Sequence, residues 1–502
     1  MGYALAAGSG VLLALSFPKF GHPAFAWVAL APLLIALKGA PLRRAFFLGL
    51  LAGGIYFTGT LYWITRVMAL YGGLATPIAM LVNAALIAYL ALFPAVFALV
   101  VRRLAVAYGR RAFLAVPFVW AATELGRTYI ITGFPWVLLG YSQATVLPIA
   151  QFASLAGVYG VSMLVTTTST ALAAFATAAP TTATYTRARP LVLTIVLVVG
   201  VAAWGSERLA TNTLTASGDT IRVGMVQGNV DQGEKMSLQR STEIFQDYID
   251  KTRQAIAKGA AFVLWPESST PFIFEEDHDA ANRVREVARE AHAAILVGSD
   301  QVERGRPNKW FNSAFLVGPD GIVAGVYRKI HLVPFGEYVP LQKLLFFAAP
   351  LTEQVGTFSP GTSAELLPVR GHPVSVSICY EVVYPALVRT FVEAGSELLT
   401  TITNDAWFGA TSAPYQHFEQ ASMRAIEEGR YMVRSANTGI SGIVDPYGRV
   451  LARTAINEPA VVVGDVRFVR TTTFYARHGD VLTYGSALLT AALLVAARRR
   501  VQ

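Results

Sequence analysis

The sequence predicts a multi-span α-helical membrane bundle joined to an extracytoplasmic layered α/β domain, and three observations predict it. Only 15% of the 502 residues are charged and 54% are hydrophobic, whereas a soluble domain carries about 25% charged residues. The deficit of charge is confined to roughly the first two hundred residues and the last twenty. The segment from about Thr220 to Arg470 has the composition of a soluble domain, with short apolar runs alternating with amphipathic stretches.

Apolar stretches of spanning length account for the membrane bundle. A spanning helix needs about 20 apolar residues, with about 17 as the usual lower end. Leu191–Ala203 has no polar stripe, which a long helix of a soluble protein would show. About eight spans are predicted, at roughly 3–17, 24–37, 45–64, 76–101, 112–126, 157–178, 190–206 and 482–497.

Lysine and arginine are distributed unevenly between the predicted loops. With the N-terminus inside, the short outer loops hold only Lys19, Arg66 and Arg127. The inner loops hold many more lysine and arginine residues, which is the positive-inside pattern of membrane proteins. We therefore interpret the net charge of +9 as a sign of membrane orientation, and we expect no nucleic acid partner. The inner residues are Lys38, Arg43, Arg44, Arg102, Arg103, Arg110, Arg111, Arg187, Arg189 and, in the tail, Arg498, Arg499 and Arg500.

These observations predict three regions. Residues 1–207 form a membrane domain with about seven spanning helices. Residues 208–470 form an extracytoplasmic globular domain, and residues 471–502 return to the membrane through the last spanning helix and a basic cytoplasmic tail. Glu124, near the end of a span, is either functional or reaches the interface. Gly49 and Gly53 form a G-x-x-x-G pattern, which we interpret as helix packing.

In the globular segment, strands alternate with helices. In the first helix Ile244, Phe245, Tyr248, Ile249 and Ile256 share one face. The turn Gly318–Gly321 separates two strands, and Asp445–Gly448 is a second turn. The predicted strands are 221–227, 262–265, 294–298, 314–317, 323–327, 374–378, 398–402 and 441–444, and the predicted helices are 241–257, 280–291, 385–394 and 417–430.

Three of these strands end close to an ionisable residue: Glu267, Lys329 and Cys379. Ligand sites form at the carboxyl ends of strands in layered α/β folds. A carboxylate can take the proton of a thiol, and a lysine can stabilise the thiolate and then an oxyanion. Cys379 is the one cysteine of the chain, which excludes a disulfide within it. A lone cysteine is more often a core residue, but the three side chains together are sufficient for acyl transfer.

Longer motifs surround these residues. The order Glu, Lys, Cys resembles the nitrilase superfamily, which implies an α-β-β-α sandwich. Several segments resemble the apolipoprotein N-acyltransferase family, the membrane-integrated branch of that superfamily. The resemblance covers nearly the whole chain and rests on Trp265–Ser268, His331–Pro340, Ile378–Glu381, Asn404–Gly409, Gly133–Trp136 and Gly140–Gln143.

The resemblance implies a role for each residue of the site. Cys379 is the nucleophile, Glu267 the general base and Lys329 the cation that stabilises the thiolate and oxyanion. Glu337 and Glu381 orient Lys329 and tune the thiol, or else form surface salt bridges.

Three further residues are assigned to the site through the same resemblance. Tyr380 and Trp407 match aromatic positions near the pocket, or pack in the core. Asn312 donates hydrogen bonds in the site. Met236 departs from the family, where a tryptophan is usual, and this puts contacts with the acyl chain in doubt.

The implied reaction has two steps. The thiolate of Cys379 takes an acyl chain from a phospholipid, and the N-terminal amine of a diacylglyceryl-cysteine apolipoprotein then accepts it. No metal or other cofactor is expected. The implied location is the bacterial inner (cytoplasmic) membrane, multi-pass, with the catalytic domain on the periplasmic face. Since both substrates are lipids, whose burial is worth about 0.8 kcal/mol per methylene, the site must lie at the outer interface.

The apolar segment Leu341–Leu351 directly follows the Glu337 motif. It predicts a loop that enters the interface and gates lipid entry through Phe346 and Phe347, or else ordinary core packing.

Three other functions fit parts of the sequence. A membrane-anchored nitrilase- or amidase-type hydrolase would use the same Glu, Lys and Cys with water as acceptor. A transporter should show several charges within its spans, and the sequence offers little beyond Glu124. A lipoprotein-binding scaffold would not require Cys379.

Overall fold

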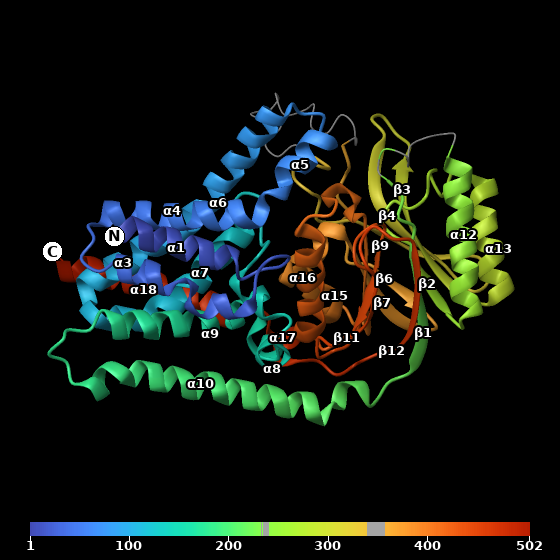
Figure 1. Ribbon diagram of the computed structural model, residues 1–502. Coiled ribbons are helices and arrows are strands. Elements are labelled where there is room, and N and C mark those ends of the chain that lie inside the picture. The colour runs from blue at the N-terminus through green and yellow to red at the C-terminus, as the bar shows by residue number, and fades with distance from the viewer. Residues whose placement is uncertain (232, 234–239, 339–356, 502) are drawn as a thin grey trace. The chain divides into compact units, whose positions relative to one another are not determined.

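The computed structural model describes residues 1–231, 233, 240–338 and 357–501. The chain divides into two compact units (Figure 1). Unit 1 comprises Met1–Arg66, Ala75–Thr211 and His478–Gln502, and unit 2 comprises Val67–Leu74 and Asn212–Arg477.

Unit 1 is built from helices, and each predicted apolar stretch contains one. Its long helices are α4 (Leu42–Leu61), α6 (Thr76–Tyr108), α9 (Ala153–Ala176), α10 (Thr184–Thr211) and α18 (Val481–Val501). Its shorter ones are α1 (Gly2–Ala14), η1 (Pro23–Phe25), α2 (Ala26–Ala29), α3 (Ala31–Ala36), η2 (Gly109–Ala115), α7 (Val116–Tyr129), η3 (Leu139–Gln143) and α8 (Leu147–Ala150), and α5 (Trp63–Leu70) runs from unit 1 into unit 2.

Five helical segments of the described chain are long and apolar enough to cross a membrane. One of them, Thr76–Tyr129, covers two of the predicted spans. Two further apolar helices, Gly2–Ala14 and Pro23–Ala36, fall below the length of a span. Several candidate spans are therefore present, and the count of about eight is not confirmed.

Close packing of α4 against α6 explains the two glycines of the G-x-x-x-G pattern. A β-carbon at Gly49 would collide with the carbonyl oxygen of Pro94, and one at Gly53 would lie 2.9 Å from the Cα of Ala91. Because only glycine lets the two backbones approach this closely, the predicted packing role is confirmed.

Unit 2 is an α-β-β-α sandwich (Figure 1). One six-stranded sheet has the order β12-β1-β2-β3-β4-β5 and the other the order β11-β10-β9-β8-β7-β6. In both sheets two parallel pairs are flanked by antiparallel ones. The strands are β1 (Thr220–Gln227), β2 (Phe262–Leu264), β3 (Ala294–Glu303), β4 (Lys309–Val317), β5 (Val323–Arg328), β6 (Leu366–Val369), β7 (His372–Ile378), β8 (Leu398–Thr403), β9 (Met432–Ala436), β10 (Gly442–Val444), β11 (Val450–Arg453) and β12 (Ala460–Arg467).

Two helices cover the outer face of each sheet (Figure 1). They are α12 (Ser241–Ala257) and α13 (His278–Ala291) on the first sheet, and α15 (Pro385–Glu393) and α16 (Ala413–Glu428) on the second. The apolar face predicted for α12 packs into a core with Trp265 and strand residues of the first sheet. Between the sheets, the hydroxyl of Ser435 on β9 donates to the carbonyls of Val226 and Leu264, both at 3.1 Å.

Every strand predicted in this unit is present, most with slightly different ends, and four more were not predicted: β6, β9, β11 and β12. Strand β11 is mostly exposed and β12 mostly half-buried, so neither has the buried pattern of the central strands. The predicted helix 417–430 begins earlier, at Ala413, where Pro414 occupies the first turn, and it ends at Glu428 before Gly429.

Candidate active site

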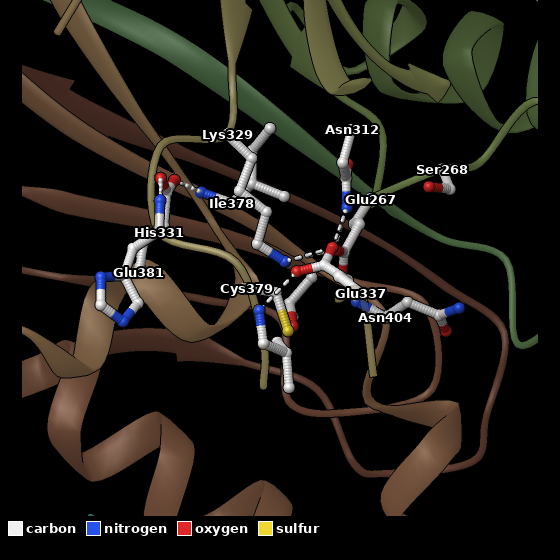
Figure 2. Close-up of polar contacts among 12 residues, drawn as sticks. Glu267, Ser268, Asn312, Lys329, His331, Glu337, Ile378, Cys379, Glu381 and Asn404 are labelled. Atoms are coloured by element: carbon white, nitrogen blue, oxygen red, sulfur yellow. Dashed lines mark hydrogen bonds and ion pairs between the residues drawn. The ribbon is translucent and has the colours of Figure 1, made fainter. Parts of the chain in front are cut away.

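Glu267, Lys329 and Cys379 come together at one end of the sandwich of unit 2 (Figure 2). Glu267 follows β2, Lys329 follows β5 directly, and Cys379 follows β7 directly. Glu267 and Lys329 lie on one sheet and Cys379 on the other, so the site forms where the two sheets meet.

Lys329 is held between two carboxylates. Its Nζ lies 2.9 Å from Oε1 of Glu337 and 3.2 Å from Oε1 of Glu267. The side chain of Lys329 is only 1% exposed, and the two carboxylates are nearly as buried. A buried ammonium is stable only with such partners, so the three groups form one ionic cluster.

Backbone N–H groups and a side-chain amide provide further hydrogen bonds to the two carboxylates. Nδ2 of Asn312 donates to Glu267 at 2.7 Å and to Glu337 at 3.0 Å. The backbone N–H of Asn404 donates to Oε2 of Glu267 at 2.9 Å, and that of Val333 donates to Oε2 of Glu337 at 2.7 Å. Each carboxylate therefore keeps a fixed orientation.

Glu267 and Lys329 keep their charges at neutral pH. Burial alone would raise the pKa of Glu267, but the charge of Lys329 and the hydrogen bonds from Asn312 and Asn404 outweigh it and lower the pKa. Burial alone would lower the pKa of Lys329, but the charges of Glu267 and Glu337 raise it above its ordinary value. Glu267 is thus an ionised base beside a permanent cation.

Cys379 is a neutral thiol at rest. Burial raises the pKa of its thiol first, the charge of Glu267 raises it further, and Lys329 opposes both. Its side chain belongs to the same polar cluster as these two residues (Figure 2). A thiol of this kind must lose its proton to become a nucleophile, and the charge of Glu267 is one of those that act on it.

Glu381 anchors the backbone around the thiol. It accepts hydrogen bonds from the hydroxyl of Tyr327 at 2.8 Å and from the backbone N–H groups of Ile330 (2.6 Å), His331 (3.1 Å) and Ile378 (2.7 Å). Burial raises the pKa of Glu381 to about 7, although these hydrogen bonds act to lower it. Surface salt bridges are excluded for Glu337 and Glu381, since both are buried.

Of the predicted aromatic residues, Tyr380 is buried beside the ring of His331, with the centroids 5.9 Å apart. The hydroxyl of Tyr384 donates to that of Tyr380 at 3.1 Å. Trp407 is partly exposed and makes an edge contact with Tyr71, at 5.1 Å between centroids. Phe346, Phe347 and Met236 lie outside the described residues.

Residues that the sequence analysis did not select also reach the site. Asp405, His417 and Arg434 form a buried polar group behind Cys379. Asn404 and Asp405 directly follow strand β8, and this is the same kind of position that predicted Glu267, Lys329 and Cys379. His417 and Arg434 lie inside a helix and a strand, where sequence gives no such signal. In the described part of the chain, no group of three or more His, Cys, Asp or Glu could hold a metal ion.

Comparison with known proteins covers both units. Residues 9–171 match the family described as apolipoprotein N-acyltransferase N-terminal domain, and residues 222–475 match the carbon-nitrogen hydrolase family. A Geobacter metallireducens protein named apolipoprotein N-acyltransferase is 41% identical over 501 residues, which cover 99% of this chain and 95% of that protein.

A Methylococcus capsulatus protein of the same name is 34% identical over 502 residues, covering 99% of this chain and 96% of that protein. Among solved structures, an amidase from Nesterenkonia sp. is 21% identical with a TM-score of 0.40, over 55% of this chain and 98% of the amidase.

Proposed function

This chain belongs to the apolipoprotein N-acyltransferase family, and we propose that Cys379 carries the acyl group, with Glu267 as general base and Lys329 as the cation that stabilises charge on oxygen. The chain is an acyltransferase, with a nitrilase-like domain as its catalytic part. The observation that carries the residue assignment is the buried contact of Lys329 with Glu267, whose charges both act on the thiol of Cys379.

In the first step Glu267 takes the thiol proton while the sulfur attacks the carbonyl carbon of a phospholipid ester. Negative charge then develops on the carbonyl oxygen, and Lys329 stabilises it. As the carbon–oxygen ester bond breaks, Glu267 returns the proton to the leaving oxygen. The products are a lysophospholipid and a thioester on Cys379.

In the second step the neutral N-terminal amine of a diacylglyceryl-cysteine apolipoprotein attacks the thioester. Glu267 accepts a proton from the amine, the carbon–sulfur bond breaks, and Glu267 passes that proton to the leaving sulfur of Cys379. The product is an amide. This reaction needs no metal or other cofactor, because one buried base and one buried cation supply both proton transfer and charge stabilisation.

The other site residues support these three. Glu337 and Asn312 hold Lys329 and Glu267 through hydrogen bonds of 2.9 Å and 2.7 Å, respectively. Glu381 acts on the backbone before Cys379 rather than on Lys329, through its bond from the N–H of Ile378.

Two aromatic residues and one segment complete the proposed site. Tyr380 and Trp407 line the approach to it. The segment with Phe346 and Phe347 stays a proposed lipid gate on the strength of its apolar sequence.

We further propose that unit 1 is the membrane domain, with about eight spans counting the two short apolar helices and α18. The domain limits proposed from sequence are 1–207, 208–470 and 471–502. They lie close to the boundaries between the two compact units, at Thr211 and His478. The location proposed is the bacterial inner membrane, with the catalytic domain on the periplasmic face, as the lysine and arginine distribution favours.

Mass spectrometry of the purified full-length protein incubated with phospholipid tests the proposal. An acyl adduct on Cys379, absent in Cys379→Ala, is the expected result, and an unmodified cysteine that still supports acyl transfer would overturn it. Adding a diacylated lipopeptide should discharge the adduct into an amide much faster than water does. The hydrolase alternative is not favoured by the relatives of this chain, and it would require rapid discharge by water alone.

A further inference from the structure

A buried polar group lies behind the nucleophile and takes no part in the reaction described above. Nε2 of His417 lies 3.2 Å from the carbonyl oxygen of Cys379. Nδ1 of the same ring lies 3.0 Å from Nη2 of Arg434 and 3.1 Å from Oδ1 of Asp405. Nη2 of Arg434 also donates to Oδ2 of Asp405 at 2.8 Å. All three side chains are 1% exposed or less.

The donors in this group determine where the imidazole carries its proton. Arginine can only donate, so Nδ1 of His417 acts as an acceptor toward Arg434. Burial and the charge of Arg434 lower the pKa of His417, which keeps the ring neutral. Its single proton therefore sits on Nε2 and is donated to the carbonyl of Cys379. Asp405 balances Arg434 and is itself held by a 2.9 Å bond from the hydroxyl of Thr403.

The backbone of Cys379 needs such support. Its φ is +53°, in the left-handed region that residues with a side chain rarely adopt. Such a conformation is strained and persists only where the surroundings hold it. Glu381 holds the backbone one residue before Cys379 through the N–H of Ile378, and His417 contacts the carbonyl of Cys379 itself. The residue is therefore held on both sides.

We propose that His417 is a positioning residue for the nucleophile: its Nε2–H holds the carbonyl of Cys379, and Arg434 with Asp405 holds the ring in the required tautomer. The inference rests on the proposed role of Cys379 as the acyl carrier. Because His417 contacts the main chain and not the acyl donor, it affects the rate of thioester formation and not phospholipid binding.

Two substitutions separate positioning from ordinary packing. His417→Gln places an amide N–H near the position of Nε2, whereas His417→Asn is polar but too short to reach the carbonyl. The purified full-length variants are mixed with phosphatidylethanolamine in detergent micelles, and the acyl adduct on Cys379 is followed over time. His417→Asn should slow adduct formation by about 10²-fold, the usual effect of a small misplacement of a reacting group. His417→Gln should stay within a few-fold of wild type, and KM for the lipid should not change in either.

A matched control removes a buried hydrogen bond between strands β8 and β7 without touching the nucleophile. Thr400→Val deletes a 2.7 Å hydrogen bond to the carbonyl of Ser375 on β7 and should leave the adduct rate unchanged. Equal rates for the Gln and Asn variants, or a change confined to KM, would overturn the proposal. Cys379→Ala keeps the two questions apart: acyl transfer that survives in it contradicts the proposed function, whereas equal rates for the Gln and Asn variants contradict only the role of His417.

Discussion

The side-chain amide of Asn312 donates to Oε1 of Glu267 at 2.7 Å, and the same Nδ2 reaches Oε1 of Glu337 at 3.0 Å. An amide nitrogen can only donate, so this bond stabilises the ionised form of each carboxylate. Asn312 is also buried, at 4% exposure, so water replaces it poorly. It therefore helps to keep the base of the site ready at neutral pH.

Replacing this donor by an acid should make the base harder to ionise. Asn312→Asp adds a carboxyl group between Glu267 and Glu337, and like charge raises the pKa of Glu267 from its lowered position. The acid limb of kcat/KM for acyl transfer should then move to higher pH, so activity at pH 6 falls further than activity at pH 8. Ser313→Ala, at the neighbouring residue, serves as control; an unmoved acid limb in Asn312→Asp would contradict the argument.

Glu267→Gln should separate thiolate formation from base catalysis. Acyl transfer should fall by about 10²–10⁴-fold, the usual contribution of a general base. The pKa of the Cys379 thiol should fall as well, because the charge of Glu267 helps to raise it. Alkylation of the one cysteine by iodoacetamide, measured against pH, should therefore begin at lower pH than in wild type.

The control for that experiment is Glu276→Gln, which breaks an exposed 2.6 Å ion pair with Arg304 in the same unit. It should change neither alkylation nor transfer. An alkylation profile that shifts to higher pH in Glu267→Gln would show that its charge does not act on the thiol.

Glu381→Gln should destabilise unit 2 although it preserves the shape of the side chain. A glutamine has one acceptor oxygen, whereas Glu381 receives four donors on two. At least one buried N–H loses its partner, at a cost of about 1–3 kcal/mol. The free energy of unfolding, or the melting temperature in detergent, should fall accordingly. Glu365→Gln, at an exposed acid, is the control, and equal stability of the two variants would refute the expectation.

Arg127 should be essential for the shape of a loop in unit 1. It is 2% exposed and donates to the carbonyls of Phe134 and Trp136, the second bond being 2.6 Å long. Irregular backbone among apolar helices is tolerated only where such donors satisfy it. Arg127→Met should lower the melting temperature of the purified protein, and the exposed Arg111→Met should not.

Glu124 supports the same loop, since its Oε1 accepts from the backbone N–H of Leu139 at 2.7 Å. It is buried at 3% exposure within unit 1, so of the two alternatives for Glu124 the side chain extended to the interface is not favoured. The motif Gly133–Trp136 thus lies on this loop and Gly140–Gln143 lies in the short helix η3 that follows it, both with buried polar anchors.

The apolar segment after Glu337 carries a prediction from sequence alone. Replacing Phe346 and Phe347 by Ser should slow acylation by phospholipid while leaving the fold intact, if this segment admits lipid to the site. The rate of adduct formation on Cys379 measures it, with circular dichroism as the check on folding. Unchanged kinetics would count against the gate.

The apolar runs and the strand–helix alternation determined much of this protein by themselves. Local composition and periodicity predict helical stretches with fewer charged residues than a soluble protein has. They also predict the short strands that are followed by Glu267, Lys329 and Cys379. The family and its acyltransferase activity were likewise predictable, because long motifs such as Ile378–Glu381 are specific.

Only the tertiary structure decided which buried groups meet. The bond from His417 to Cys379 joins residues 38 apart in sequence, and that from Arg434 to Asp405 joins residues 29 apart. Neither shows in any local pattern, because a histidine in a helix or an arginine in a strand fits many environments. Edge strand β12 likewise pairs with β1, although the two strands lie near opposite ends of unit 2 in the sequence, and no local pattern shows that pairing. Side-chain pairing inside the fold, and not local propensity, sets the protonation and backbone geometry of the candidate site.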